Sequence, residues 1–398
     1  MKKKLLFMCI NMNIGGTEKA LLNMIAEIPK DKYEVTILML EQYGGFLSEI
    51  PEWVKVKYLD NYSEIKPILN NPPQSTIKKF IRKGRIIKAV NIAWAYYTSK
   101  ILRNKSIFFK YILSDYSILK GEYDLAVAYA GPMDFITYYV LNKIKANKKA
   151  QWIHFDIELI GFDKYFAGKH YSEFNKIFIV SEKGKEKLLN KLPNVKDKVE
   201  VFYNIVSEDL VREMSVKGNG FEDEFDGTRI LTVGRLSKEK GQDLFISALA
   251  KLKSEGYKVR GYIIGDGPNK NKYQNLINNL GLKDNCILLG AKKNPYPYMK
   301  ECDIYVQPSR HEGYCITLAE ARCFNSPIIT TEFTGASEQL INEERGVITK
   351  IDSEDIYLAM KKLLDNKRLI KNIKIKLEKE IVDSRTQITK LSEFISSI

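Results

Sequence analysis

The sequence is poor in the side chains that build metal centres and disulfide frameworks. Its 398 residues include only three histidines, and the five cysteines are scattered without a CxxC spacing. Such usage is typical of a reducing cytoplasm and argues against a zinc site or a disulfide scaffold. No apolar run reaches the ~18 residues that a membrane-spanning helix needs. We therefore expect a cytoplasmic protein without a metal ion or other cofactor.

The first ten residues superficially resemble a signal peptide, because Lys2, Lys3 and Lys4 precede an apolar run. That run is short, and Gly15-Gly16-Thr17-Glu18 stands where a cleavage site would be expected. A buried first strand that leads into a glycine loop explains this pattern better.

Acidic residues are absent between positions 77 and 113, where ten basic residues alternate with aromatic and aliphatic ones. The chain as a whole carries 63 basic and 49 acidic residues, a net charge of +14. Basic residues mixed with apolar ones at helical spacing indicate a segment in the plane of an anionic membrane. A nucleic-acid patch and an ordinary solvated helix are the alternatives, and the apolar content favours lipid. The residues expected at the membrane are Lys78, Lys79, Arg82, Lys83, Arg85, Lys88 and Trp94.

Strand and helix patterns alternate in both halves of the chain. This alternation predicts an α/β protein with two doubly wound parallel sheets, and the length suits two domains. A long helical pattern from 353 to 382 follows the last strand. Ligands of such folds bind at the carboxyl ends of the strands. The expected strands are 4–10, 33–40, 125–129, 151–154 and 176–180 in the first half, then 229–233, 259–264, 285–289, 303–307, 327–331 and 346–349.

The loop after strand 229–233 carries two cations in Gly234-Arg-Leu-Ser-Lys-Glu-Lys-Gly241. The planar fork of Arg235 can hold two phosphate oxygens, and Lys240 adds a compact charge. Such a pair suits a diphosphate leaving group where no metal neutralises it. Surface charge in a loop is the alternative.

Two glutamates eight positions apart, Glu312 and Glu320, flank a change from loop to helix in Glu-Gly-Tyr-Cys-Ile-Thr-Leu-Ala-Glu. A helix beginning near Thr317 offers unpaired N–H groups to a phosphate. The spacing suits a nucleotide-sugar, with sugar hydroxyls at one carboxylate and ribose hydroxyls at the other. A solvated acidic pair on a surface helix is equally compatible with these residues.

Weaker signals accompany these loops. Gly265 and Gly267 form a tight turn after a strand, and Gly15 and Gly16 turn the chain after the first one. His154, at a strand end, can bind a sugar hydroxyl, act as an acid or base, or be an ordinary core histidine. The full GxGxxG array of dinucleotide-dependent dehydrogenases is missing.

Together these motifs resemble the retaining, GT-B-fold glycosyltransferases of the family-4 type, most clearly from about 229 to 340. Glu312 and Glu320 match the E-x7-E motif of that family, and 234–241 matches its diphosphate-binding turn. The resemblance implies two facing Rossmann-like domains with the ligand cleft between them, over 1–205 and 206–370, and a C-terminal helix over 371–398 that packs back on the first domain. Ile205 stands where the family usually has a glycine after Asn204. The resemblance implies a catalytic set of Glu312, Arg235, Lys240 and His154, and donor binding by Gly15, Gly16, Gly265, Gly267, Gly313, Tyr314, Cys315, Ile316, Thr317 and Glu320.

The implied activity is metal-independent transfer of a hexose-type sugar from a nucleotide-diphosphate sugar, with UDP the favoured nucleotide. The expected acceptor is a lipid-linked glycan or a cell-surface polysaccharide, at the inner face of the cell membrane. A GT-B-fold epimerase or phosphorylase is the alternative enzyme. A non-catalytic membrane or nucleic-acid binding protein is the other alternative, and the intact set of Arg235, Lys240, Glu312 and Glu320 argues against it.

Overall fold

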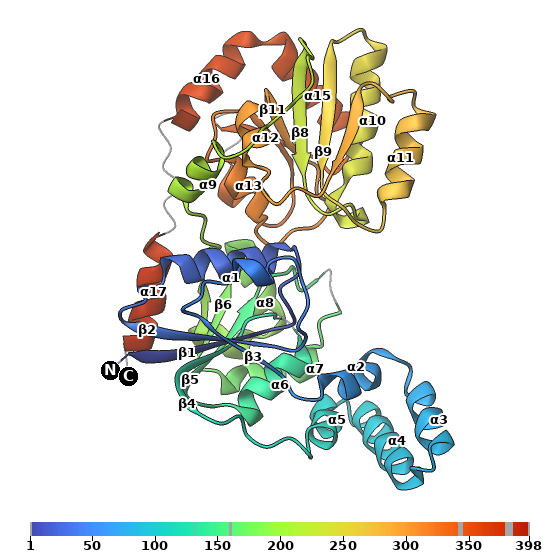
Figure 1. Cartoon of the computed structure of the whole chain (residues 1–398), viewed down its shortest axis with the longest axis vertical. Helices are drawn as coiled ribbons and strands as arrows, with labels where there is room; N and C mark the ends of the chain where they lie inside the picture. Colours follow the sequence, from blue (N-terminus) through green and yellow to red (C-terminus); the bar gives the residue numbers. More distant parts are fainter. Residues whose placement is uncertain (1, 132, 159–160, 341–344, 379–384, 397–398) are drawn as a thin grey trace. The chain divides into compact units, whose positions relative to one another are not determined.

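The computed structural model describes residues 2–131, 133–158, 161–340, 345–378 and 385–396. The chain divides into two compact units, each built on one parallel sheet (Figure 1). Unit 1 consists of Met1–Val180, Lys185–Phe202 and Ile388–Ile398, and unit 2 of Ser181–Gly184 and Tyr203–Gln387.

The sheet of unit 1 has the strand order β3-β2-β1-β4-β5-β6-β7. Strand β1 pairs with both β2 and β4, so the order of the strands reverses at this point. Side chains of β1 and β2 are buried in nearly continuous runs, as expected for parallel strands covered on both faces. The strands are β1 (Lys3–Cys9), β2 (Tyr33–Met39), β3 (Lys55–Tyr58), β4 (Glu122–Ala128), β5 (Lys145–Ile153), β6 (Lys176–Ile179) and β7 (Val199–Val201).

Helices cover this sheet, and four of them lie between β3 and β4 in the sequence, where the basic segment was predicted to be an insertion. Among the described residues, no helix combines the length and the apolar character needed to cross a bilayer. The helices that lie wholly or mostly in unit 1 are α1 (Gly16–Glu27), α2 (Tyr62–Asn70), α3 (Pro73–Arg82), α4 (Ile86–Ile101), α5 (Lys105–Ile112), α6 (Asp134–Lys143), α7 (Lys164–His170), α8 (Glu182–Lys191) and α17 (Arg385–Ser396).

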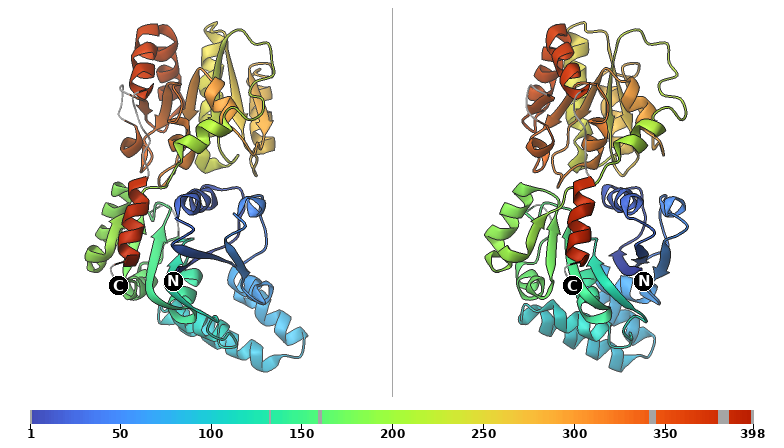
Figure 2. Two further views of the ribbon diagram at one scale, coloured as in Figure 1. Left: turned by 60° about the vertical axis from the view of Figure 1, so that its left-hand side comes forward. Right: turned by 90° about the vertical axis from the view of Figure 1, so that its left-hand side faces the viewer.

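Helix α17 belongs to unit 1 although unit 2 precedes it in the chain. The Phe394 ring meets the Phe178 ring edge-on at 5.7 Å, and Lys148 Nζ donates to the Phe394 carbonyl at 2.6 Å. Lys390 Nζ donates to the carbonyl of Val201 in β7. Both views in Figure 2 show α17 beside the strands of this sheet.

The sheet of unit 2 has the order β10-β9-β8-β11-β12-β13, which reverses between β8 and β11. Its strands are β8 (Thr228–Val233), β9 (Val259–Ile264), β10 (Cys286–Gly290), β11 (Ile304–Gln307), β12 (Ile328–Thr331) and β13 (Gly346–Thr349). Its helices are α9 (Glu208–Met214), α10 (Gln242–Ser254), α11 (Lys270–Asn279), α12 (Tyr296–Glu301), α13 (Ile316–Ala321), α14 (Ala336–Gln339), α15 (Ser353–Asp365) and α16 (Lys367–Glu378).

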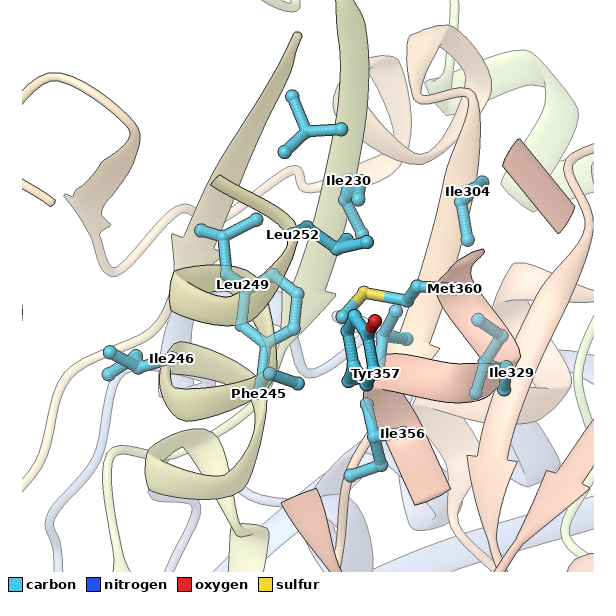
Figure 3. Close-up of a cluster of buried hydrophobic side chains, with 14 of the residues drawn as sticks. Ile230, Phe245, Ile246, Leu249, Leu252, Ile304, Ile329, Ile356, Tyr357 and Met360 are labelled. Carbon is cyan, nitrogen blue, oxygen red and sulfur yellow. The ribbon is translucent and has the colours of Figure 1, made fainter. Parts of the chain in front are cut away.

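A core of apolar side chains holds α10 and α15 against the unit 2 sheet (Figure 3). Phe245 and Leu249 of α10 face Ile230 of β8, and Tyr357 and Met360 of α15 close the cluster. Fully burying a side chain of this size contributes about 1.5–3 kcal/mol. This core fixes the positions at which the strands end, and therefore the loops that follow them.

The two doubly wound parallel sheets confirm the predicted α/β class. One expectation was wrong: the pattern from 353 is two helices, because Asn366 leaves the helical region (φ −121°, ψ 79°). Its side chain accepts from Leu369 N–H and so starts α16. Residues 379–384, at the end of the expected helix, lie outside the described residues.

Candidate functional site

The two motif-bearing loops of unit 2 follow β8 and β11, the neighbouring strands between which the strand order reverses. At such a point the loops from the two strands run to opposite sides and leave room for a ligand. A Cβ on Gly241 would lie 1.9 Å from the Pro308 carbonyl oxygen, and Arg310 N–H donates to the Glu239 carbonyl at 2.7 Å. The residues predicted from two distant motifs are therefore held together.

Lys240 and Glu312 form an ion pair across these loops, with 2.5 Å between Nζ and Oε1. The side chains are 24% and 11% exposed, so water screens the pair only in part. Burial by itself would lower the pKa of Lys240, but the Glu312 carboxylate outweighs burial and raises it. Lys240 is thus a cation, and its ion pair with Glu312 holds its charge in place.

A polar chain on the sheet side holds Glu312 in place. Ser309 Oγ donates to Glu312 Oε1 at 2.8 Å, and Gln307 Nε2 donates to Ser309 Oγ at the same distance. The Tyr305 hydroxyl and the Thr317 hydroxyl both donate to Gln307 Oε1, at 2.8 and 3.2 Å. One buried amide therefore connects the carboxylate loop to the first turn of α13.

Arg235 behaves differently from Lys240. Its side chain is exposed, and no hydrogen bond or ion pair holds its guanidinium within the described residues. Its backbone is fixed, because Gln242 Nε2 donates to the Arg235 carbonyl at 2.9 Å and Gly234 N–H donates to Ile264. A guanidinium on a fixed backbone with five unused donors is suited to a bidentate contact with phosphate.

Gly265 and Gly267 pack against the loop that carries Arg235. Gly265 has φ +150°, and a Cβ there would lie 2.0 Å from the Gly234 carbonyl oxygen. A Cβ on Gly267 would lie 2.5 Å from the carbonyl oxygen of Leu236. The structure thus gives both glycines a packing function, and their contact with a donor stays a prediction.

Helix α13 begins at Ile316, one residue before the predicted start. Cys315 caps it in the left-handed conformation (φ +64°), which is uncommon for a residue with a side chain. The Gln339 amide donates to the carbonyls of Tyr314 and Cys315. A Cβ on Gly335 would lie 2.6 Å from the Gly313 carbonyl oxygen. These contacts fix the loop 313–315.

Glu320 is only 3% exposed, so a solvated surface glutamate is excluded for this position. The Tyr296 hydroxyl, from α12, donates to Glu320 Oε1 at 2.8 Å. Tyr296 was not predicted, because it lies 24 residues away on another helix and belongs to no motif. The carboxylate of Glu320 is therefore buried and held in place by a residue of another helix.

His154 lies in unit 1, directly after β5, and is 6% exposed. Its ring is stacked on Trp152 with 12° between the planes and meets Tyr129 at 4.5 Å. Neither ring nitrogen meets a hydrogen-bond partner among the described residues. Burial lowers the pKa of His154 to about 3. The imidazole is therefore neutral near pH 7 and suited to hydrogen bonding rather than to general-base catalysis.

Gly15 and Gly16 also belong to unit 1, at the start of α1. A Cβ on Gly15 would lie 2.5 Å from Glu18 Oε2, so the glycine leaves room for this carboxyl group. Burial raises the pKa of Glu18. Glu18 is a further polar group in the segment that follows β1. It is part of the motif Gly-Gly-Thr-Glu, but only the two glycines were predicted to bind the donor.

The predicted membrane residues are on the surface of the helical insertion in unit 1. Arg82, Lys83, Arg85 and Lys88 are exposed, and Trp94 is 65% exposed. Within the described ranges, no group of three or more His, Cys, Asp or Glu side chains is arranged to hold a metal ion.

Residues 221–380 match the model of the family described as glycosyl transferases group 1. This part of the chain is similar to the glycosyl transferases group 1 family. The matched range contains Arg235, Lys240, Glu312 and Glu320, and it confirms the family resemblance of the motifs.

Two curated proteins that are similar to this chain are named as glycosyltransferases. An uncharacterized glycosyltransferase of Methanocaldococcus jannaschii is 30% identical over 193 residues, 47% of each chain. The N-acetylgalactosamine-N,N'-diacetylbacillosaminyl-diphospho-undecaprenol 4-alpha-N-acetylgalactosaminyltransferase of Campylobacter jejuni is 29% identical over 216 residues, 54% of this chain and 57% of the relative. The chain thus spans about half the length of the curated relatives it matches.

A solved structure supports the fold over the full length. The crystal structure of Anabaena HepE in complex with UDP-glucose aligns with a TM-score of 0.68, covering 99% of this chain and all of that one, at 16% identity. At this identity the likeness shows the fold alone, which is the GT-B fold that the sequence motifs predicted.

Proposed function

We propose that the protein is a retaining glycosyltransferase that moves a hexose-type sugar from a nucleotide-diphosphate sugar, with UDP as the nucleotide, to a lipid-linked glycan or cell-surface polysaccharide. The observation that carries this proposal is the pairing of Lys240 with Glu312, in a loop that also carries the exposed Arg235, whose guanidinium has no partner among the described residues. Two cations and a carboxylate, gathered where β8 and β11 end, suit a diphosphate joined to a sugar.

Each residue has a part in the proposed reaction. The bond between sugar C1 and the diphosphate oxygen breaks, and the oxygen keeps the electron pair. Arg235 and Lys240 stabilise the charge that develops on this oxygen, together with the N–H groups of 314–317. The acceptor oxygen forms its new bond to C1 on the same face, and its proton passes to the departing diphosphate. Glu312 contacts the transferred sugar, Glu320 the ribose, and the neutral imidazole of His154 a sugar hydroxyl.

The nature of donor and acceptor is supported by the relatives. The Campylobacter relative is named for a diphospho-undecaprenol substrate, and the HepE structure contains UDP-glucose. We propose the same classes of substrate for this chain, with the reaction at the cytoplasmic face of the cell membrane.

A thermal-shift panel of nucleotide-sugars tests the donor assignment. A ligand at 100 times its Kd stabilises the folded protein by about 2.7 kcal/mol, so the correct donor stands out. Incubation of that donor with and without membrane lipid extract then tests transfer. We expect nucleotide release to depend on the acceptor. Conversion of the sugar without an acceptor indicates an epimerase, and no shift with any nucleotide-sugar contradicts the proposed function.

A further inference from the structure

Helix α4 carries apolar residues on the face that is turned to solvent. Ile87 is 77% exposed, Trp94 65% and Ile101 80%. At 100° per residue these three side chains lie within about 40° of one another. A surface helix of a globular protein has charged or polar residues on this face. The complete exposed row, called here the α4 ridge, is Ile86, Ile87, Val90, Trp94, Tyr97 and Ile101.

The opposite face of α4 is the one that packs on the protein. Its buried residues are Ala89, Ile92, Ala95 and Ser99, most of them small. The helix therefore already has its structural contacts, and the α4 ridge contributes nothing to the core of unit 1. In Figure 1, α4 and α3 form the end of the insertion that is farthest from the unit 1 sheet.

Cations surround the start of the α4 ridge. Arg82, Lys83, Arg85 and Lys88 are exposed, and none of them forms an ion pair in the part of the chain that the structure describes. No carboxylate occurs from 77 to 113 that could neutralise them. An unpaired cationic cluster next to an exposed apolar row is complementary to a surface that is anionic outside and apolar beneath.

That combination distinguishes lipid from two other partners. A nucleic acid would use the cations but gains little from aliphatic side chains such as Ile87 and Ile101. A second copy of the chain would cover the α4 ridge, but would bring a second set of uncompensated cations close to the first. The interface of an anionic bilayer satisfies both features at once.

The insertion is firmly attached to unit 1 through α5. Lys105 Nζ lies 2.6 Å from Asp134 and 3.0 Å from Asp163, and Ser106 Oγ lies 2.6 Å from His170 Nε2. Phe109 packs on the rings of α6 and α7. These contacts join the insertion to helices α6 and α7 of unit 1.

We propose that α4 lies in the interface of an anionic membrane, with the α4 ridge among the acyl chains and the cations of 82–88 on the lipid phosphates. This inference deepens the proposed function, on which it rests only for the choice of acceptor: docking would bring unit 1 to a lipid-linked substrate.

Vesicle flotation of the full chain tests the proposal. Binding is expected to vesicles of phosphatidylglycerol and phosphatidylcholine, and to be weak on phosphatidylcholine alone. Ile87→Asp with Ile101→Asp is expected to weaken binding more than about tenfold, because a charged residue replaces an inserted apolar one. Charge reversal at Arg82, Lys83 and Lys88 should do the same, since each basic residue near the surface contributes about fivefold.

Matched variants control for general effects. Val216→Asp replaces another exposed aliphatic residue, and Lys367→Glu with Lys371→Glu reverses exposed cations on α16. Both should bind as the unaltered protein does. The nucleotide-sugar donor should stabilise all variants in the thermal-shift assay as it does the unaltered protein. A variant that loses vesicle binding but keeps this stabilisation has lost docking and not the proposed function.

Trp94 supplies a direct readout of depth, because Trp53 is half-buried and Trp152 is buried. Its emission should shift to the blue on anionic vesicles and be quenched by brominated acyl chains, and Trp94→Phe should remove both effects. Binding that is unaffected by the paired aspartates overturns the proposal. A Trp94 emission that does not shift on anionic vesicles also overturns it. The same holds if the protein forms a dimer that the two aspartate substitutions dissociate. It holds as well if the protein binds nucleic acid as tightly as it binds vesicles, and the double aspartate variant still does so.

Discussion

Lys240 Nζ lies 2.5 Å from Glu312 Oε1, although the two residues are 72 positions apart in the chain. We expect Lys240→Ala to lower kcat/KM at least about a hundredfold if the lysine stabilises the departing diphosphate. The unpaired Glu312 should also reduce the free energy of unfolding by about 2 kcal/mol. Steady-state kinetics and urea unfolding measure the two effects.

Lys251→Ala is the matched control for that variant. It removes an ion pair with Glu354 in the same unit, but both side chains are about half exposed (47% and 48%). A change below about 1 kcal/mol in stability and none in activity is expected, because exposed pairs contribute little. Equal effects of both variants on kcat/KM contradict a catalytic function for Lys240.

Arg235→Ala should separate activity from stability. The exposed guanidinium has no partner among the described residues, so the free energy of unfolding should not change. We expect a loss of at least ~2 kcal/mol in transition-state stabilisation, which is about a 30-fold lower kcat/KM. Arg235→Lys should recover part of it, since one point charge replaces a bidentate fork. An unchanged kcat/KM excludes the contact with the diphosphate.

Tyr296→Phe tests Glu320 without removing the carboxylate. Loss of the hydroxyl that donates to Oε1 should raise the donor KM several-fold and leave kcat nearly constant, if Glu320 holds the ribose. The stability cost of one such hydrogen bond is about 1 kcal/mol. Tyr298→Phe, on the same helix, is the control and should leave the donor KM unchanged.

The neutral, buried His154 gives unit 1 a specific pH dependence. Its folded-state pKa is lowered to about 3, whereas an unfolded histidine titrates near 6.5. Between these values the unfolded state binds the extra proton, so stability falls as pH falls. His154→Phe removes this dependence. The difference in the free energy of unfolding between the variant and the unaltered protein should therefore change by about 1.4 kcal/mol per pH unit between pH 6 and 4.

Urea unfolding followed by Trp152 fluorescence measures this effect, because the indole is stacked on the imidazole. The pKa of His170 is lowered too, first by its burial, but it titrates in both proteins and cancels in the difference. Parallel stability curves for His154→Phe and the unaltered protein contradict the assignment of a neutral buried ring.

The strands of unit 2 could be predicted almost to the residue, and the reason is local. Strands such as β9 (Val259–Ile264) are buried apolar runs that end at a glycine, so composition marks both their length and their end. β3 was missed because its residues, Lys55 to Tyr58, are half-buried or exposed at the sheet edge and show no apolar run. Asn366 was missed because a single capping residue interrupts an otherwise continuous helical pattern.

The candidate site could be predicted only where its residues lie in one motif. Glycines and spacing mark the loops of Arg235, Lys240 and Glu312, and the structure brings Lys240 and Glu312 together. Partners supplied by other elements left no signal: Tyr296 reaches Glu320 from α12, and Gln307 binds both Ser309 and Thr317 from a strand end. Such contacts depend on packing between elements, which a single sequence does not record.

Because helix α17 belongs to unit 1, parts of unit 1 lie both before and after Tyr203–Gln387, the long stretch of unit 2. Exchange of this stretch between related chains therefore requires two junctions, after Phe202 and after Gln387, rather than one. A swap at the first junction alone would bring in a foreign last helix, with no guarantee of a ring to meet Phe178 or a backbone to receive Lys148. The long stretch of unit 2 can be replaced as a cassette, whereas unit 1 is inherited intact only if its parts before and after Tyr203–Gln387 come from the same parent.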